Sequence, residues 1–476
     1  MNHRRRSPLP TTVTLRGVRT APLNAASTTT TTSDGGDDHV EDEDEDEDDD
    51  NNISPAAAVT DRSTAEVSVP TFRLFYNDVY EVELPPRHRF PMGKYRKVRE
   101  RVQERIASHL AAAAGGDGDG DETKPSAVVD VGFCVSPLST FEELSTTHDP
   151  TYIRRFLEGD QTPEEQRNVG FPWSRRGVDR ALSSVGGTLA AARFVCEHER
   201  RRGLRRRGKG GGEGDDGTED GFPAWAAHIA GGTHHAFYDR GEGFSVFSDM
   251  AVAANVVLEE YPDVIRNNIL MIDLDVHQGN GNAVLFRKKS NSSSSKHSDR
   301  VFTFSMHCAG NYFSRKQESD LDIELPVGCK DQAYLMTLHH WLKRFRIEHR
   351  KPREPDEPEP LRWDLVIFQA GVDVLEDDRL GRMALSPGGV ARRNELVYGF
   401  VRDLGVPLVI CMGGGYPKKD NHGDDDGAWE SILETHSEVY FGAHRFLDSW
   451  LRDDETTTTT TTPEATSTST TNRSGG

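Results

Sequence analysis

The sequence predicts a single α/β domain, with a central, mostly parallel sheet covered by helices on both faces. Two observations support this fold class. Between about Thr71 and Asp453, short apolar β-branched runs alternate with longer amphipathic runs. The short runs are apolar on both sides, as in strands buried between two helix layers. The predicted strands are Thr71–Tyr76, Val128–Val135, Ile269–Val276, Val301–Met306, Leu365–Ala370 and Val406–Met412, and the predicted helices include Val178–His198, Asp249–Glu260, Ala333–His349 and Pro387–Leu404.

The two ends of the chain differ from this middle part. Twelve of the fourteen residues from Asp37 to Asp50 are acidic, within a net charge of −21, and the C-terminal end is rich in Thr and Ser. Neither end can bury enough apolar surface to offset chain entropy, so residues 1–70 and 453–476 are expected to be disordered. The acidic run is interpreted as a solubilising tail, with docking to a basic partner as the alternative. The Arg-, Ser- and Thr-rich first 33 residues suit a transit peptide or a plain leader, so nucleus, cytoplasm and organelle all stay open.

The composition argues against several classes of protein. No stretch approaches the ~18 apolar residues of a membrane span. The five cysteines form no C-x-x-C pair, so a disulfide framework and a thiolate zinc site are both disfavoured. An Arg-rich patch near 200–221 has no interleaved aromatic residues, which favours a solvated loop over nucleic-acid binding. This patch and the segments near 287–300, 350–360 and 418–427 are interpreted as surface insertions in one domain.

Two predicted strands end in residues that could bind a metal ion. Alternate side chains of an extended strand face the same way, which would put Asp273, Asp275 and His277 on one face. Such a buried face is unfavourable unless a cation compensates the charge; the alternative is a strand end in solvent whose acids cap a helix. Asp373 follows the second strand and would join them if the two strands are neighbours. The set Asp275, His277 and Asp373 would leave a coordination position open for water, as catalytic zinc sites do.

Proton-transfer groups follow the same kind of strand end. His234 and His235 come after a Gly-Gly turn that could bring both rings into a cleft. Asp273 exceeds what the metal needs, so it could bind one imidazole and fix its tautomer, while Asn280 could hold the other ring. Tyr416 follows three glycines and could donate a hydrogen bond to an oxyanion. Phosphate binding by these glycines is the alternative, but no G-K-[ST] follows them.

Several ordered motifs resemble the histone deacetylase superfamily, over about residues 71–450. They are Gly231–Phe244, Asp273–Gly281, Gly371–Asp373 and the three glycines before Tyr416. Three further features are similar to the class IV branch and its bacterial relatives: the form His-Gln-Gly-Asn, Arg89–Tyr95 and Asp378–Arg382. The resemblance implies the arginase/deacetylase fold and removal of acyl groups from lysine amines, with histones among the candidate substrates.

The resemblance also implies catalytic roles. His235 would be the general base and then the acid, with His234 assisting and Asp273 orienting His234. Tyr416 would polarise the acyl carbonyl. Many relatives have an Asp at the position of Asn280, so the pKa values of the two histidines are expected to differ from theirs.

Three binding sites follow from the same resemblance. They are zinc at Asp275, His277 and Asp373; a tunnel for the lysine stem at Gly243, Phe244 and Phe313; and a structural potassium ion near Asp273, Ser305 and Met306. The expected partner is an acyl-lysine protein or peptide, and the acyl group and the oligomeric state stay open.

Two rival functions remain. A small-molecule amidohydrolase on the same fold would act on acetylpolyamines or, with two metals, as a ureohydrolase. The two-metal version needs extra carboxylates, whereas this chain has Asn280 and Leu375 at the positions concerned. The second rival is a non-catalytic module that binds acyl-lysine, against which the full set of proton-transfer groups argues.

Overall fold

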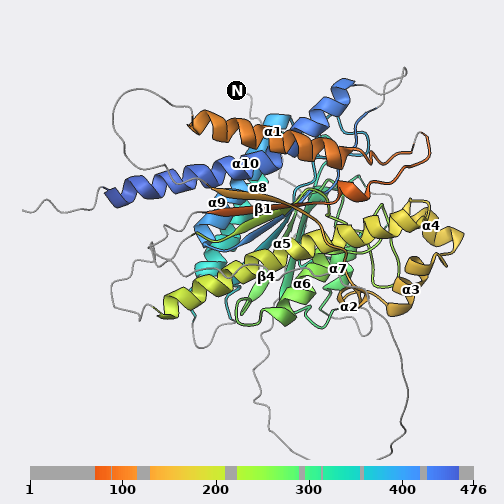
Figure 1. Ribbon diagram of the computed structural model, residues 1–476, viewed down its shortest axis with the longest axis horizontal. Coiled ribbons are helices and arrows are strands. Elements are labelled where there is room, and N and C mark those ends of the chain that lie inside the picture. The colour runs from red at the N-terminus through yellow and green to blue at the C-terminus, as the bar shows by residue number, and fades with distance from the viewer. Residues whose placement is uncertain are drawn as a thin grey trace, which may run out of the picture. The chain divides into compact units, whose positions relative to one another are not determined.

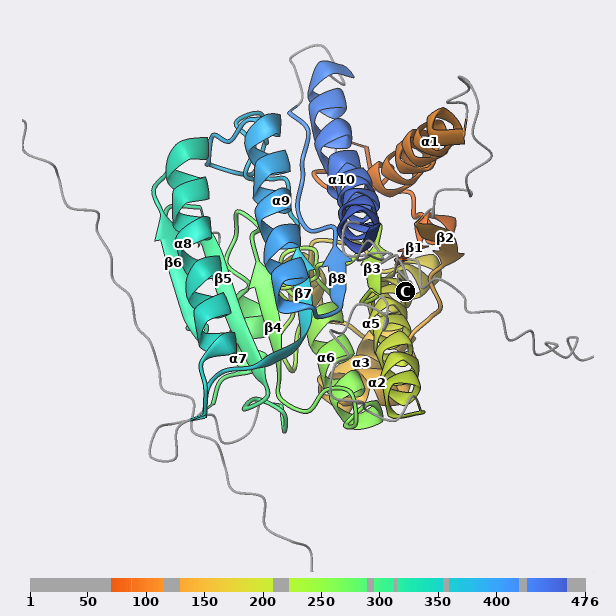
Figure 2. The same cartoon turned by 90° about the vertical axis from the view of Figure 1, so that its left-hand side faces the viewer.

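The computed structural model describes residues 70–86, 88–114, 129–208, 222–288, 295–311, 315–353, 359–418 and 426–459. Within these residues, eight parallel strands form one sheet (Figure 1), in the order β2-β1-β3-β8-β7-β4-β5-β6 (Figure 2). The strands are β1 Thr71–Tyr76, β2 Asp130–Val135, β3 Trp225–His228, β4 Asn268–Asp273, β5 Val301–Cys308, β6 Leu321–Leu325, β7 Trp363–Gln369 and β8 Leu408–Cys411. The predicted α/β class with a parallel sheet is therefore confirmed.

Helices cover both faces of this sheet. They are η1 Asp78–Tyr80, α1 Lys94–Ala114, α2 Phe141–Ser145, α3 Pro150–Glu158, α4 Pro163–Val169, α5 Arg175–Gly208, α6 Asp249–Glu260, α7 Asn280–Leu285, α8 Asp331–Arg350, α9 Pro387–Leu404 and α10 Asp426–Thr459. One layer is formed by α8, α9, α10 and α1, each packed against the next in that order. Helices α5 and α6 pack together on the opposite face of the sheet (Figure 2). No helix in the described part of the chain combines the length and the apolar character that crossing a membrane requires.

The two layers bury alternate residues of each strand. In β4, Leu270 and Ile272 belong to the core beneath α8–α10, whereas Ile269 and Met271 belong to the core beneath α5 and α6. Both sets are almost fully buried, which explains why the strand reads as a continuous apolar run. Because side chains alternate along a strand, one sheet supports two cores.

Helix boundaries follow from local capping. Ser386 begins α9 by accepting the Gly389 backbone N–H at 2.9 Å, and Pro387 occupies the first turn, where its missing N–H does no harm. Gly405 ends the helix with a φ of 69°, a conformation that glycine adopts easily. The predicted bounds of α6 and α9 are confirmed residue for residue.

Other predicted boundaries were wrong. Residues 200–208 of the Arg-rich patch are not a loop, because α5 continues to Gly208 and Arg200 pairs with Asp263 at 2.6 Å; residues 209–221 lie outside the described residues. Helix α10 begins at Asp426 and continues to Thr459, past the predicted end of the domain. The acidic run and the leader up to residue 69 lie outside the described residues, as do residues 460–476.

Candidate active site

The four central strands of the sheet supply the candidate site residues. The order β3-β8-β7-β4 places four carboxyl ends side by side at one edge. His234 and His235 follow β3, Tyr416 follows β8, Asp373 follows β7, and Asp275 and His277 follow β4. Strands β4 and β7 pair in parallel, so the condition for Asp373 to join Asp275 and His277 is met. The carboxyl edge is where open α/β sheets place their sites.

Asp275, His277 and Asp373 form a buried group with the geometry of a metal site. Each offers one ligand atom, and these atoms lie within 4.8 Å of one another. Nδ1 of His277 lies 3.1 Å from Oδ1 of Asp275 and 3.2 Å from Oδ2 of Asp373. Among the described residues, this is the one group of three or more acidic, His or Cys side chains whose ligand atoms lie close enough together to hold one metal ion.

The predicted extended strand through His277 is wrong. Strand β4 ends at Asp273, and the next residues bend instead of continuing the ladder. The backbone N–H groups of the next residues donate to side-chain carboxylates and not to carbonyl oxygens of a neighbouring strand. The N–H of Asp275 donates to Asp273, that of Val276 to Asp373, and that of His277 to Asp275, at 2.9–3.1 Å. The three polar side chains are therefore oriented by hydrogen bonds to carboxylates and not by strand alternation.

The charges of this group fit a bound divalent cation. Burial and the charge of Asp275 raise the pKa of Asp373 to about 6. Burial lowers the pKa of His277, but its hydrogen bonds to Asp275 and Asp373 outweigh that effect and raise it to about 10. In the protein alone, a protonated imidazole thus supplies the positive charge that the two buried carboxylates need. A bound cation could replace this proton and supply the positive charge. The nitrogen and oxygen atoms of the group are ligands that zinc accepts.

The glycine-rich loop after β8 approaches these carboxylates closely. A Cβ atom at Gly414 would lie 2.0 Å from Oδ2 of Asp373, and one at Gly371 would lie 2.4 Å from Oδ2 of Asp275. The N–H of Gly414 donates to Oδ2 of Asp275 at 2.7 Å. Gly414 after β8 and Gly371 after β7 are therefore needed for the close approach of the backbone to the acids.

His234 and His235 lie together in the site but in opposite environments. Their ring centroids are 4.0 Å apart. Nδ1 of His234 lies 2.7 Å from Oδ2 of Asp273, and Nδ1 of His235 lies 2.7 Å from Oδ1 of Asn280, so both predicted partners are confirmed. Burial lowers the pKa of His234, but the charges of Asp273 and Asp275 outweigh it and raise that pKa. Burial and the neighbouring histidines hold the pKa of His235 well below its ordinary value.

Asn280 fixes the tautomer of His235. Its amide nitrogen donates to Glu242 at 3.2 Å, and its oxygen accepts the Gly281 N–H at 3.0 Å. The oxygen therefore faces Nδ1 of His235, which must carry the hydrogen in that bond. Nε2 of His235 is then the unprotonated nitrogen, as a general base requires.

Tyr416 is buried beside the metal group and is held by two residues that the sequence analysis missed. Lys94 is 1% exposed and donates to the carbonyl oxygens of Gly413 and Gly415, at 3.2 and 3.4 Å. Asp378 accepts the Tyr416 N–H at 2.6 Å. Burial, with the charges of Asp373 and Asp275, keeps the pKa of Tyr416 well above its ordinary value, so the phenol remains a donor. Both residues lie in the motifs RFPMGKY and DRLGR, but the motifs gave no reason to expect a contact with Tyr416.

Arg393 is a third residue that the sequence analysis missed. It is completely buried, and its guanidinium donates to the carbonyl oxygens of Gly371 at 2.6 Å and Ala370 at 3.1 Å. The carbonyl of Leu274 lies 3.4 Å away. Arg393 thus ties together the two segments that carry Asp275 and Asp373.

Aromatic side chains surround the approach to Tyr416. Phe244 packs 5.1 Å from Phe90, 5.4 Å from Phe171 and 6.1 Å from Tyr416, measured between ring centroids. Phe244 has a φ of 65°, the one positive value for a non-glycine residue in the described part of the chain. Gly243 precedes it with a φ of 55°, and strained backbone of this kind clusters at functional sites. Phe313 lies outside the described residues, so its predicted place in the tunnel stays a prediction.

The residues expected to bind potassium lie on neighbouring strands. Asp273 of β4 pairs in register with Ser305 of β5, and Met306 follows it. This alignment is compatible with the expectation, and the ion remains a prediction.

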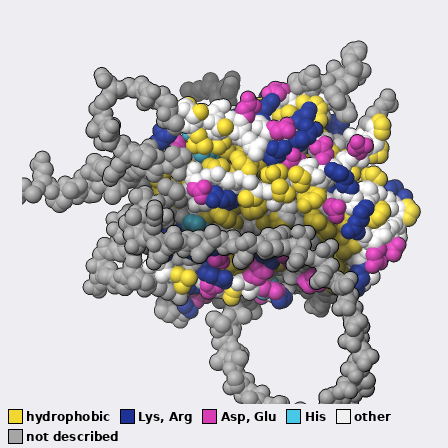
Figure 3. Space-filling model, viewed as in Figure 1, with side chains coloured by type: hydrophobic (Ala, Val, Ile, Leu, Met, Phe, Trp, Pro, Cys, Tyr) yellow, Lys and Arg dark blue, Asp and Glu magenta, His cyan; other side chains and the backbone are white. Residues whose placement is uncertain are grey.

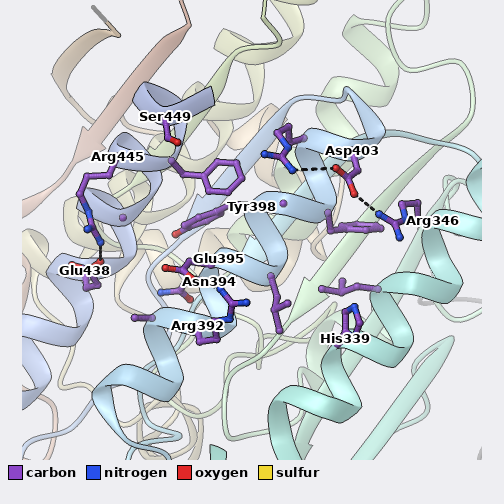
Figure 4. Close-up of a pocket in the computed structure, with 18 of the residues that line it drawn as sticks. His339, Arg346, Arg392, Asn394, Glu395, Tyr398, Asp403, Glu438, Arg445 and Ser449 are labelled. Carbon is purple, nitrogen blue, oxygen red and sulfur yellow. Dashed lines mark hydrogen bonds and ion pairs between the residues drawn. The ribbon is translucent and has the colours of Figure 1, made fainter. Parts of the chain in front are cut away.

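A groove of about 490 Å³ lies elsewhere, across α8, α9 and α10 (Figure 4). Several of its charged side chains form ion pairs: Arg346 pairs with Asp403, and Arg445 pairs with Glu438 at 2.5 Å. None of the predicted site residues lines it. The candidate catalytic residues therefore lie at the carboxyl ends of the strands and not in this groove.

Comparisons with known proteins agree with this geometry. The histone deacetylase domain family matches residues 99–432. The chain is 35% identical over 347 residues to an uncharacterized protein of Picosynechococcus sp., covering 73% of this chain and 93% of that one. It is 31% identical over 256 residues to histone deacetylase 2 of Arabidopsis thaliana, covering 53% of this chain and 51% of that protein.

A solved structure has the same fold. The crystal structure of an HDAC homolog complexed with SAHA superposes with a TM-score of 0.51 at 17% identity, covering 81% of this chain and 89% of that one. The likeness extends over most of the sheet and helices described above. The chain therefore belongs to the histone deacetylase family and has the fold of that family.

Proposed function

We propose that the protein is a zinc-dependent lysine deacylase, which hydrolyses the amide of an acyl-lysine side chain. One observation carries the proposal: a buried Asp-His-Asp group, a pair of histidines with opposite partners and a buried tyrosine meet at the carboxyl ends of four adjacent strands. Each group on its own is common. Their combination matches what water-mediated amide hydrolysis needs.

The metal group would hold the ion. Zinc bound by Asp275, His277 and Asp373 would polarise the acyl carbonyl and make a water molecule more acidic. His277 must lose its proton before its imidazole can bind the ion. Metal binding would therefore depend on pH, as for any site with an imidazole ligand.

His235 is the proposed proton carrier. Its unprotonated Nε2 accepts a proton from the attacking water, and the same proton is then given to the leaving lysine amine. The low pKa of His235 keeps it neutral before reaction and makes its protonated form a strong acid afterwards. His234, with its raised pKa and its bond to Asp273, stabilises negative charge next to it without exchanging a proton.

Tyr416 is the proposed donor to the oxyanion. As the acyl carbonyl becomes tetrahedral, charge develops on its oxygen, and a phenol O–H in a buried site stabilises that charge more than water would. The raised pKa of Tyr416 means that it donates the hydrogen bond and keeps its proton.

The substrate class is proposed from the family and from the walls of the site. The aromatic rings of Phe244 and Phe90 could pack along the apolar stem of a lysine side chain, with the amide directed toward Tyr416. The motifs similar to class IV relatives suggest that branch, and histones are one candidate carrier.

A direct test is amine release from acyl-lysine peptides whose acyl chains increase in length from acetyl, with acetylpolyamines as a parallel series. We expect turnover of acyl-lysine peptides, with one acyl length preferred. Preferred turnover of acetylpolyamines would favour the small-molecule alternative. Tight binding of acyl peptides without any amine release would favour a silent binding module and contradict the proposal.

The two-metal ureohydrolase has less support. Asn280, where a second bridging acid would be needed, is already engaged by His235 and Glu242. Asp273 is likewise engaged by His234. A bridging pair of metals would need these oxygens.

A further inference from the structure

We propose that Asp378 is a positioning residue for Tyr416: it holds the backbone of the tyrosine so that the phenol O–H points at the reacting carbonyl. This inference rests on the proposed function and adds to it a residue outside the metal and histidine groups. It is drawn from the hydrogen bonds that join the segments after β7 and β8.

Both oxygens of the Asp378 carboxylate are used. Oδ1 accepts the N–H groups of Leu380 and Gly381, each at 2.7 Å, and Oδ2 accepts the N–H of Tyr416 at 2.6 Å. The side chain is 3% exposed, so water does not compete for these donors. Hydrogen bonds from buried N–H groups to a carboxylate are among the stronger ones in proteins.

The neighbouring backbone completes the clamp. The carbonyl oxygen of Tyr416 accepts the N–H of Arg379 at 2.9 Å, so the tyrosine is bound on both sides of its Cα by residues 378 and 379. Asp378 and Pro417 also form a short antiparallel bridge. The turn at residues 378 and 379 therefore fixes both the N–H and the C=O of Tyr416, the residue that carries the phenol.

This clamp is needed because the loop is rich in glycine. Gly413, Gly414 and Gly415 precede Tyr416, and glycine restricts backbone rotation least. A side chain at Gly414 would collide with Asp373, and one at Gly415 would collide with His436, so rigidity must come from outside the loop. Lys94 fixes the glycine carbonyls, and Asp378 fixes the tyrosine itself.

The test is a double-mutant cycle of Asp378→Asn with Tyr416→Phe, measured on the preferred acyl-lysine peptide. Either orientation of an Asn side chain turns an N–H₂ group toward a backbone N–H donor, so Asp378→Asn loses one side of the clamp with little change in volume. We expect kcat to fall about tenfold to a hundredfold with KM changed about twofold or less. In the Tyr416→Phe background, the same substitution should change kcat by less than about twofold, because the hydroxyl that it positions is already gone.

Asp377→Asn is the matched control, because Asp377 is the preceding residue and its carboxyl side chain is 67% exposed. It should leave kcat within about twofold of wild type. Zinc content and zinc affinity should be the same in wild type and Asp378→Asn, which separates positioning of Tyr416 from damage to the metal group.

Several results would overturn the inference. Equal losses of kcat from Asp378→Asn in the wild-type and Tyr416→Phe backgrounds would assign the residue a general structural role. Loss of zinc affinity in Asp378→Asn would move its role to the metal group. If wild-type protein loaded with zinc releases no amine, the proposed function fails; turnover by wild type with an additive cycle refutes only the role of Asp378.

Discussion

Two regions of the molecule are crowded with charged side chains, and they use them in opposite ways. In the groove across α8–α10, several charged side chains form partly exposed ion pairs between Arg and an acid: in one of them, Arg445 is 50% exposed and Glu438 is 19% exposed. At the carboxyl edge of the sheet, the side chains of Asp275 and Asp373 are 2% and 0% exposed, and no Lys or Arg side chain in the described residues forms an ion pair with either. Both acids pair with the imidazole of His277, and buried charge of this kind is costly unless it is paired or bound by a cation. The buried acids at the carboxyl ends of the strands are therefore the better candidate for chemistry.

The largest effect should come from removing a buried acid. Asp275→Asn replaces one charge of the metal group without changing its volume, and we expect loss of measurable turnover together with weaker zinc binding. Zinc affinity by chelator competition and amine release would be measured on the same preparation. Asp160→Asn, at an exposed position, is the control. Full activity of Asp275→Asn would mean that the buried charge serves stability only.

Tyr416→Phe should come next. Removal of one hydrogen-bond donor to an oxyanion reduces kcat by about 10²–10³ in other enzymes, and we expect that range here with little change in KM. Tyr398→Phe removes the same atom from a buried tyrosine whose hydroxyl binds the Val439 carbonyl at 2.6 Å, near the groove. It should lower the free energy of unfolding by about 1 kcal/mol and leave kcat unchanged. Similar kinetic effects from the two variants would contradict the division between the regions.

Asn280→Asp should change the pH dependence. The new carboxylate would lie against Nδ1 of His235 and raise the pKa of that imidazole, which burial now keeps low. The base must be unprotonated, so activity is lost as pH falls through its pKa. The acidic limb of the kcat/KM profile is therefore predicted to move to higher pH. An unchanged limb would show that His235 is not the titrating base.

The smallest effect is expected in the groove. Arg346→Ala breaks a partly exposed ion pair with Asp403 and should lower the free energy of unfolding by less than ~1 kcal/mol. Thermal or denaturant unfolding would measure this, and kcat should stay at the wild-type value. A large loss of activity would mean that the groove is linked to catalysis after all.

Much of the site could be predicted from local patterns. Asp275, His277 and Asp373 each follow an apolar run, and the pairing of two histidines with Asp273 and Asn280 follows from counting the groups that the metal leaves over. Strand ends were harder to predict. Leu274 and Val276 are as buried as the strand itself, so the apolar pattern continues after the ladder of β4 has stopped.

Residues that position others could not be predicted in this way. Lys94 and Arg393 are cations in helices, and such residues are usually solvated. Only the tertiary structure brings their side chains to the carbonyl oxygens of distant loops, more than 300 residues away in the case of Lys94. Strand β6 was missed because Leu321–Leu325 is short and polar at alternate positions, as an edge strand is.

The central claim is that one metal ion at Asp275, His277 and Asp373 makes the buried site a lysine deacylase. Metal-free protein titrated with zinc while amine release from an acyl-lysine peptide is followed tests it most directly. Activity should rise from none and level off at one zinc ion per chain. Full activity without metal, or a rise that ends only at two ions per chain, would contradict the account.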